Sequence, residues 1–297
     1  MPETMVKQNI QSTETKQVQA RKKRDGWMKI LFLAATSVGV LALMLLIIDI
    51  MIDGVARFTP ELFTNYPSRR ADGSGLKSAL VGTLYMVCIM APISFLIGVG
   101  AAIFLEEYAK KNRLTRLIQL NISTLAGVPS IVYGILGLTI FVRGLNLERS
   151  LISGALTMTL LVLPVIIVSA QEAIKSVPGS RRDASFALGA SKWQTVQRSV
   201  LPSAFPGILT GIILAVSRAI GETAPLVMIG ALTYVAFLPS NLMDQFTVLP
   251  IQIYNWISKP QTSFHDLAAS GIIVLLILLL TLNLIAVVLR NKYQKNL

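Results

Sequence analysis

The chain has 297 residues, of which 53% are hydrophobic and only 14% are charged, against about 25% charged residues in a typical soluble domain. The 27 Lys and Arg against 15 Asp and Glu give a formal net charge of +12, which in a soluble protein can indicate nucleic-acid binding. A mean hydropathy of +0.64 argues against that class. The apolar residues stand in long blocks, and residues 271–289 hold no ionisable side chain. We therefore predict an integral membrane protein with several spans and no nucleic-acid partner.

Cysteine and histidine are each present once, as Cys88 and His265. One cysteine cannot form a disulfide within the chain, and one histidine removes most zinc and histidine-base chemistry. The segment Gly73–Ser78 resembles a phosphate-binding loop only superficially, because its Gly and Lys are not adjacent. We predict no catalytic residue, no metal ligand and no nucleotide site in this chain, and we expect Cys88 to be a small core residue.

Six apolar segments are long enough to cross a membrane, and each is predicted to be a helix because isolated strands cannot span lipid. The predicted fold is all-α and polytopic, with six transmembrane helices over residues 30–52, 78–105, 117–142, 151–170, 204–228 and 270–289. The first apolar run is too long for a signal peptide, so we expect it to be retained as a span. Pro225 is expected to interrupt the fifth helix.

Positive charge is unevenly divided between the two sets of connecting segments. If both termini are cytoplasmic, most of the 27 Lys and Arg fall on the cytoplasmic side. Because cytoplasmic loops carry an excess of Lys and Arg, we predict a plasma-membrane protein with its N- and C-termini inside the cell.

Arg218 and Glu222 are the strongest polar signal inside a predicted span. Their spacing of four places them on one helix face, where they can pair. A charge within the bilayer costs at least about 2.5–3.5 kcal/mol on insertion scales, so such residues usually pair and face protein or water. The planar guanidinium of an arginine can bind an oxyanion, so one interpretation of the pair is an anion pathway. A buried ion pair that only fixes helix packing is equally supported by this pattern.

Small residues recur every four positions on the same helix, at Gly207, Gly211, Ala215 and Ala219. Such a stripe lets another helix approach closely. We predict tight packing there, within the subunit or against a partner.

The long cytoplasmic loop before the fifth helix is predicted to form two short helices. The first covers residues 181–188 and ends at Gly189, a typical position for a left-handed cap. Ser191 is expected to cap the second, over residues 192–200, which Pro202 closes. Apolar residues stand among charges here. By themselves they support two interpretations, a helix resting on lipid headgroups and a docking element for a partner protein.

The loop also resembles a known family. Asp183, Ala184 and Ser185, then Gly189, then the run Val200–Pro202 are similar to the "EAA" loop of ABC-importer permeases, with Asp in place of Glu and Ser in place of the second Ala. The resemblance implies that the loop is a coupling helix docked on an ATPase subunit, with Asp183, Ala184 and Gly189 at the contact.

Three further stretches narrow the resemblance. Gly127–Gly134 and Ser217–Pro225 resemble the permeases of phosphate importers, and Leu249–Asn255 points to one of the two paired permeases, the A subunit. The resemblance implies a type I ABC importer permease fold and a role for Arg218 and Glu222 in translocation. It also implies a second homologous permease, two ATPase subunits on the cytoplasmic side and an extracytoplasmic phosphate-binding protein. No cofactor is expected in this chain, since ATP and Mg would be bound by the ATPase subunits.

The resulting expectation is a transport subunit without enzymatic activity of its own, surrounded by membrane lipid. Its predicted parts are a cytoplasmic polar and basic tail (1–28), a first transmembrane helix (29–52), an extracytoplasmic loop (53–76), a core permease domain (77–290) with the coupling loop 171–203, and a cytoplasmic C-terminal tail (291–297). The alternative is a self-contained ion-coupled secondary transporter of an anion, which would need no docking loop.

Overall fold

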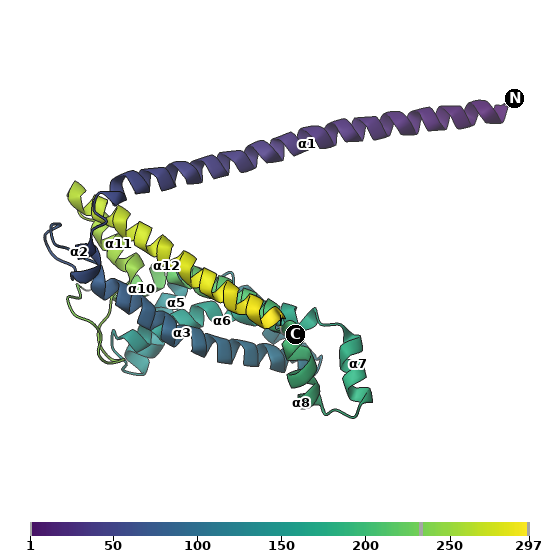
Figure 1. Cartoon of the computed structure of the whole chain (residues 1–297). Coiled ribbons are helices and arrows are strands. Elements are labelled where there is room, and N and C mark those ends of the chain that lie inside the picture. The colour runs from purple at the N-terminus through teal and green to yellow at the C-terminus, as the bar shows by residue number, and fades with distance from the viewer. Residues whose placement is uncertain (1, 232–233, 296–297) are drawn as a thin grey trace. The chain divides into compact units, whose positions relative to one another are not determined.

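The computed structural model describes residues 2–231 and 234–295, and every regular element in these ranges is helical, which confirms the predicted all-α class. The chain divides into two units, Met1–Ile52 and Asp53–Leu297, which are described separately. Figure 1 labels most of the helices. The α-helices after the first are α2 (Pro60–Thr64), α3 (Lys77–Ile103), α4 (Arg113–Leu125), α5 (Ser130–Gly137), α6 (Leu151–Lys175), α7 (Gly179–Ala187), α8 (Lys192–Thr195), α9 (Leu201–Ile220), α10 (Ala224–Ile229), α11 (Leu249–Ile257) and α12 (Thr262–Lys295).

The first unit lies within helix α1, Pro2–Val55, which is continuous from the predicted basic tail through the first predicted span and ends three residues into the second unit. Its part Asp25–Val55 is long and apolar enough to cross a membrane. The structure contains no lipid, so the boundary at residues 28 and 29 stays a prediction.

Five helices within the described residues are long and apolar enough to cross a membrane, and the count is six if one bent pair is a single span. The expectation of six helices is therefore met only with that bent pair. The five are Asp25–Val55, Lys77–Tyr108, Leu151–Lys175, Lys192–Ile220 and Thr262–Lys292.

Helix α6 lies at the centre of the second unit. In its most apolar 18-residue stretch, 61% of the residues are buried. In the corresponding stretches of the other four long helices the share is 28% or less. Helices α3 and α9 both pack against it, and large side chains such as Met86, Met158 and Ile208 close the core. Lipid tails are as apolar as this core, so close packing rather than water exclusion holds the helices together in the membrane.

The third predicted span, residues 117–142, is not one straight helix. Helix α4 ends at Leu125, α5 begins at Ser130 and a π-helical segment continues to Gly144, with a bend of 105° between the two parts. Gly127 and Pro129 lie in the break, and proline lacks the backbone N–H that a continuous helix needs. The apolar run continues through the break, so the sequence predicted one span there, with Pro129 as a candidate for a kink.

The fifth span also differs from expectation. The α8–α9 helix is continuous from Lys192 to Ile220, and Pro202 lies in the first turn of α9 instead of closing a short helix. A π-helical segment, Val196–Val200, precedes it. The helix ends at Ile220, eight residues before the predicted end at 228, and Pro225 lies in the first turn of the separate helix α10. The fifth span is interrupted as predicted, but the break lies at residues 221–223, before Pro225.

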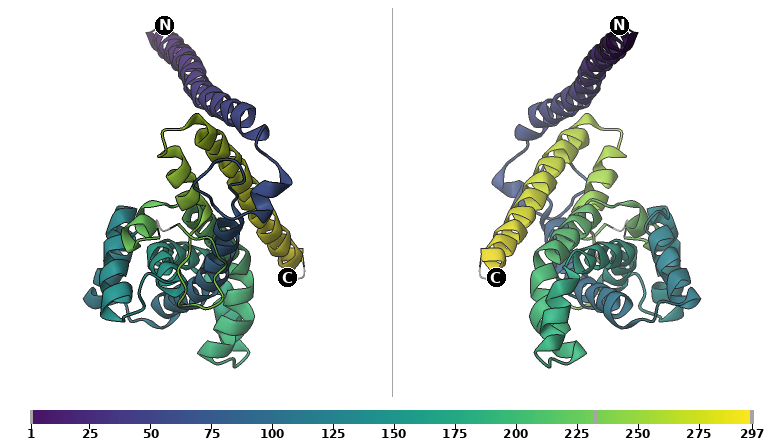
Figure 2. Two further views of the ribbon diagram at one scale, coloured as in Figure 1. Left: turned by 90° about the vertical axis from the view of Figure 1, so that its left-hand side faces the viewer. Right: turned by 90° about the vertical axis from the view of Figure 1, so that its right-hand side faces the viewer.

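Helices α2 and α11 lie at one end of the second unit, and α7 and α8 lie at the other (Figure 1). At the α11 end a second apolar cluster includes Leu62, Leu76, Trp256 and Phe264. Helix α11 lies beside α12 in both views of Figure 2. Cys88, expected in the core, is exposed on α3 instead; one cysteine gave no periodic signal that would have placed it.

The N-terminus of α6 is capped by the loop that precedes α11. The amide N–H groups of Leu151 and Ile152 donate to the backbone carbonyls of Asp244 and Leu242, at 2.9 and 3.0 Å. The carboxylate of Asp244 in turn accepts from the amides of Ser240 and Asn241 and from the Ser240 hydroxyl. The loop therefore satisfies amides that begin a helix and have no partner within it.

We predict that this loop opens in acid. Hydrogen bonds from the amides of Ser240 and Asn241, and from the Ser240 hydroxyl, hold the pKa of Asp244 below its usual range. A lowered pKa contributes stability above the unfolded value, near 4, which is lost as the pH falls through the folded value. Hydrogen exchange at Leu151 and Ile152 should rise at acid pH in the wild type. In Asp244→Asn exchange should already be raised at neutral pH and should change less with acid; an unaltered profile would contradict the assignment.

Candidate functional site

The small-residue stripe of α9 lies against α6 of the same chain. A Cβ atom at Gly207 would lie 2.9 Å from the Cβ of Ala173, and one at Gly211 would lie 2.3 Å from Ser169 Oγ. Two further members of the stripe, Ala215 and Ala219, are buried. The four small residues therefore allow the two backbones to approach closely.

This antiparallel register fixes the depth of Arg218. Since Gly207 faces Ala173 and Gly211 faces Ser169, continuing the register places Arg218 opposite Val162. Val162 is near the middle of the 25-residue helix α6. Arg218 and Val162 also line one small pocket, of about 20 Å³, at the α4–α5 bend. Arg218 is therefore near mid-depth of the central span, because α9 ends before reaching the α11 end.

Arg218 and Glu222 form a loose pair at this depth. Arg218 Nε lies 3.4 Å from a carboxylate oxygen of Glu222. The arginine side chain is 68% exposed in the isolated chain, whereas the glutamate side chain is 21% exposed. A guanidinium exposed near the middle of a span is costly against lipid, so it must face water or a partner protein. The arrangement is suited to an open anion path and poorly suited to a buried structural pair.

The two sequence motifs singled out above meet beside this pair. Gly134, in the first motif, lies against Pro225, in the second: a Cβ at Gly134 would approach the Pro225 Cα to 2.7 Å. Tyr133 donates its hydroxyl to the Leu125 carbonyl at 2.7 Å and so satisfies a carbonyl freed by the α4–α5 break. The α4–α5 break, α10 and Arg218 are thus held as one local structure.

Gly134→Ala is expected to destabilise the protein by about 1–3 kcal/mol, because the added methyl would overlap the Pro225 backbone, which cannot move aside as a flexible side chain can. Gly100→Ala is the matched control, since a Cβ there meets nothing within 4 Å. Thermal unfolding in detergent should separate the two variants. Equal midpoints would show that the α5–α10 contact is not tight.

The second site is the α7–α8 hairpin. Helix α7 ends before Gly189, whose φ of +80° lies in the left-handed region that favours glycine. Ser191 accepts from the Gln194 amide while the Gln194 side chain accepts from the Ser191 amide, a capping box that begins α8. Ser185 and Thr195 join the two helices by a 2.9 Å hydroxyl contact. Both local predictions, the glycine turn and the serine cap, are confirmed.

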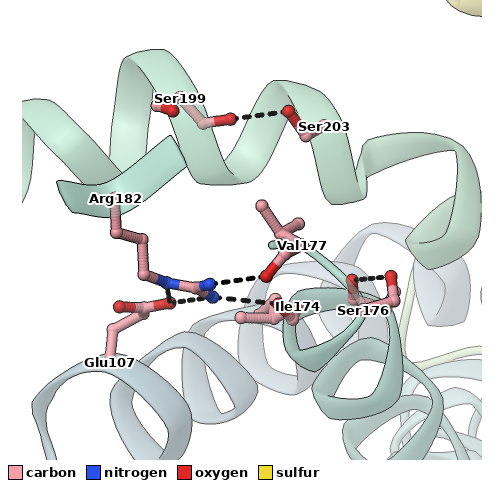
Figure 3. Close-up of polar contacts among 8 residues, drawn as sticks. Glu107, Ile174, Ser176, Val177, Arg182, Ser199 and Ser203 are labelled. Atoms are coloured by element: carbon pink, nitrogen blue, oxygen red, sulfur yellow. Dashed lines mark hydrogen bonds and ion pairs between the residues drawn. The ribbon is translucent and has the colours of Figure 1, made fainter. Parts of the chain in front are cut away.

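Arg182 fixes α7 to the helix bundle, a contact absent from the sequence predictions (Figure 3). Its guanidinium donates to Glu107 at 2.8 and 3.1 Å and to the backbone carbonyls of Val177 and Ile174 at 2.7 and 3.0 Å. The Arg182 and Glu107 side chains are only 22% and 11% exposed. Glu107 comes from the π-helical segment Phe104–Tyr108 after α3. The sequence feature that could have indicated this contact is the acidic pair Glu106 and Glu107 at the end of an apolar span.

The outer surface of the hairpin is available to a partner. Asp183, Ala184 and Gly189 are exposed. So are the apolar side chains of Leu188, at 89%, and of Phe186 and Trp193. Lys192 lies over the Tyr108 ring at 5.0 Å, a second tie to the end of α3. A rigidly held hairpin with exposed apolar side chains and one carboxylate is suited to docking.

The helical bundle, the broken helices around an exposed arginine and the rigid hairpin define a multi-pass membrane transport subunit. Residues 94–296 match the family described as "Binding-protein-dependent transport system inner membrane component". The chain belongs to this family of ABC-importer permeases, whose members act with a substrate-binding protein and an ATPase. Within the described residues, no three His, Cys, Asp or Glu side chains are grouped to hold a metal.

Named relatives cover most of the chain. It is 35% identical over 249 residues to "Probable ABC transporter permease protein YqgI" of Bacillus subtilis, covering 80% of this chain and 85% of the relative. It is 34% identical to "Phosphate transport system permease protein PstA 1" of Mycobacterium tuberculosis, covering 73% and 70%. It is 29% identical to "Phosphate transport system permease protein PstA" of Yersinia pestis, covering 91% and 93%.

Solved structures support the fold. A bacterial alginate ABC transporter chain aligns with a TM-score of 0.66 at 14% identity, covering 89% of this chain and 93% of that one. A chain of the MetNI methionine ABC transporter aligns with a TM-score of 0.58 at 18% identity, covering 71% and 93%. These likenesses, together with the family match, confirm the predicted type I importer permease fold.

Proposed function

We propose that the chain is the transmembrane permease subunit of an ATP-driven importer of inorganic phosphate. The names of the relatives in Mycobacterium tuberculosis and Yersinia pestis support phosphate as the substrate. The structural observation that supports an anion path is the exposed guanidinium of Arg218 near mid-depth of α6. Its fork can donate two hydrogen bonds to a phosphate, and Glu222 orients it while limiting how tightly an anion is held.

The path is formed with a second homologous permease. The exposed side of Arg218 then faces that subunit or the water between the two, which meets the requirement that an intramembrane charge avoids lipid. A single chain leaves this side chain open, and a pair of chains encloses it.

Two ATPase subunits dock on the cytoplasmic side, one of them on loop 171–203 of this chain. Asp183, Ala184 and Gly189 lie at the contact, beside the exposed apolar side chains of Leu188 and Trp193. ATP and Mg are held by these subunits, and the chain itself carries out no catalysis. An extracytoplasmic phosphate-binding protein delivers the anion from the other side.

Both termini are placed in the cytoplasm, and the protein in the plasma membrane. The distribution of Lys and Arg supports this orientation. The end of α12 supports it as well. Arg290, on α12, donates to Thr210 at 3.1 Å and so lies beside the half of α9 that is nearer the α7–α8 hairpin. The C-terminus and the docking loop then share one side of the membrane.

The test is affinity purification of the tagged chain from its membrane in a mild detergent, with identification of the retained subunits. An ATPase, a second permease and a phosphate-binding protein are expected in the complex. As a matched control, Leu188→Asp should lose the ATPase and keep the second permease, since Leu188 is the most exposed apolar residue of the hairpin.

A self-contained ion-coupled carrier is disfavoured by family membership, because a binding-protein-dependent permease works with other subunits. Reconstitution of the purified chain alone in liposomes is the discriminating measurement. Phosphate transport driven by an ion gradient, without an ATPase, would overturn the proposed function.

A further inference from the structure

An open cavity of about 570 Å³ lies between α4 and α6, on the side of the second unit that carries the α7–α8 hairpin. Its size is in the range of small-ligand sites. The polar and charged residues that line it are Arg113, Arg116, Gln119, Ser123, Gln171, Glu172 and Lys175. A second cavity of about 450 Å³ adjoins it, since Arg116, Gln119 and Lys175 line both. The cavities are separate from the small pocket beside Arg218.

The charges in this cavity do not cancel. Lys175 pairs with Glu172 at 3.1 Å and with Glu106 at 3.6 Å, and Glu106 also accepts from Gln171. Both nearby carboxylates are therefore engaged. Arg113 and Arg116 make no ion pair with any residue that the structure describes. Two guanidinium forks thus remain open beside amide and hydroxyl donors.

Helix α4 presents these arginines in a particular setting. It is 13 residues long, none of its side chains is buried, and it turns by 105° from the segment that follows. Arg113 and Arg116 are three apart and so share one face. Leu114, Leu117 and Leu120 are all more than half exposed. A short helix with exposed leucines and cationic forks is typical of the boundary between headgroups and acyl chains.

We propose that Arg113 and Arg116 form a phosphate-oxyanion site at the cytoplasmic end of the α4–α6 cavity. Each fork donates two parallel hydrogen bonds to anionic oxygens, and Gln119, Ser123 and Gln171 supply neutral polar contacts. The shared chemistry is a phosphate group, carried by an acidic phospholipid headgroup or by free phosphate leaving the transport path. The free-phosphate source rests on the proposed function, whereas the lipid source does not.

The experiment uses the full complex purified with its partner subunits, and it has two arms. In the first, native mass spectrometry measures the binding of added phosphatidylglycerol, with phosphatidylcholine as the neutral probe. In the second, equilibrium binding of radiolabelled inorganic phosphate is measured in discs of pure phosphatidylcholine without ATP. The double variant Arg113→Gln, Arg116→Gln is expected to bind at least about tenfold more weakly in one arm, because two charge-assisted contacts are lost.

Lys110→Gln is the matched control. It removes one positive charge from the segment just before α4, and Lys110 lines neither cavity. Arg113→Lys with Arg116→Lys keeps the charge and loses the fork, so its affinity should fall between the wild type and the glutamine variant. A loss confined to phosphatidylglycerol assigns the site to lipid, and a loss confined to inorganic phosphate assigns it to the transported anion.

The proposal is overturned if the double glutamine variant binds both probes as Lys110→Gln does. The two arginines are exposed and have no ion-pair partner among the described residues, so the double variant should fold, which its thermal midpoint checks. Binding is measured without transport. Loss of the site and failure of the proposed import function are therefore distinguishable.

Discussion

Arg218→Ala is expected to reduce phosphate uptake by at least about tenfold while leaving the chain in its complex, because the charge-assisted contacts of one guanidinium with an anion are worth about 1.5–3 kcal/mol. The structure indicates why folding should survive. The arginine side chain is 68% exposed, and its pairing with Glu222 is long, at 3.4 Å. An exposed pair of this kind typically contributes at most about 1 kcal/mol to stability. Uptake of radiolabelled phosphate by cells, together with subunit recovery on purification, measures both quantities.

Two further variants separate the roles of the pair. Arg218→Lys keeps the charge without the planar fork and should retain part of the uptake. Glu222→Gln should leave assembly intact and change the apparent affinity for phosphate more than the maximal rate, if the carboxylate limits how tightly the anion is held. Near-normal uptake by Arg218→Ala would refute the anion path. Failure of that variant to assemble would indicate a structural pair instead.

Arg182→Gln is expected to uncouple ATP hydrolysis from uptake. The substitution removes the partner of Glu107 and the Arg182 donor of the Val177 carbonyl, whereas the Ile174 carbonyl keeps the Val177 amide as a donor at 3.3 Å. Unmade contacts of buried polar groups cost about 1–3 kcal/mol each, so α7 should lose its fixed position against α3. In the purified complex, ATPase activity should persist while phosphate transport per ATP falls by about tenfold or more.

A double-mutant cycle tests the reasoning behind that expectation. Glu107→Gln removes the same ion pair from the other side and keeps both carbonyl contacts, so it should have a smaller effect. If the two residues act through one contact, the double variant should lose less than the sum of the single variants. Arg198→Gln is the control, because Arg198 is an exposed arginine of the π-helical segment Val196–Val200 and its side chain makes no ion pair with any residue that the structure describes. Full additivity would contradict a direct coupling.

Features that depend on local backbone chemistry were predictable from the sequence. The turn at Gly189 needs a positive φ, and the cap at Ser191 needs a hydroxyl beside free amides, so residue type alone indicates both. The missing N–H of Pro225 predicted a break in this span, and the break lies at residues 221–223, just before α10. By contrast, Pro202 was predicted to end a helix, but it lies inside the continuous helix Lys192–Ile220, just after the π-helical segment Val196–Val200.

Features that depend on distant contacts were not predictable. Arg182 and Glu107 are 75 positions apart, and no local pattern shows that α3 ends beside α7. The depth of Arg218 in the membrane follows from the register of α9 against α6. That register is known only from the contacts of Gly207 and Gly211 with α6. Pro129 was a candidate for a kink, but hydropathy continues across Gly127 and Pro129 and gave no measure of the 105° bend.

The unbroken helix Lys192–Ile220 has a mechanical consequence, since it carries Trp193 of the hairpin near one end and Arg218 near the other. At about 1.5 Å per residue, these two side chains are about 38 Å apart along the helix axis. A tilt of about 5° at the hairpin would therefore displace the arginine by about 3 Å, roughly the length of one hydrogen bond. Such a helix would act as a lever arm, and the π-helical segment Val196–Val200 is a place where helices typically bend.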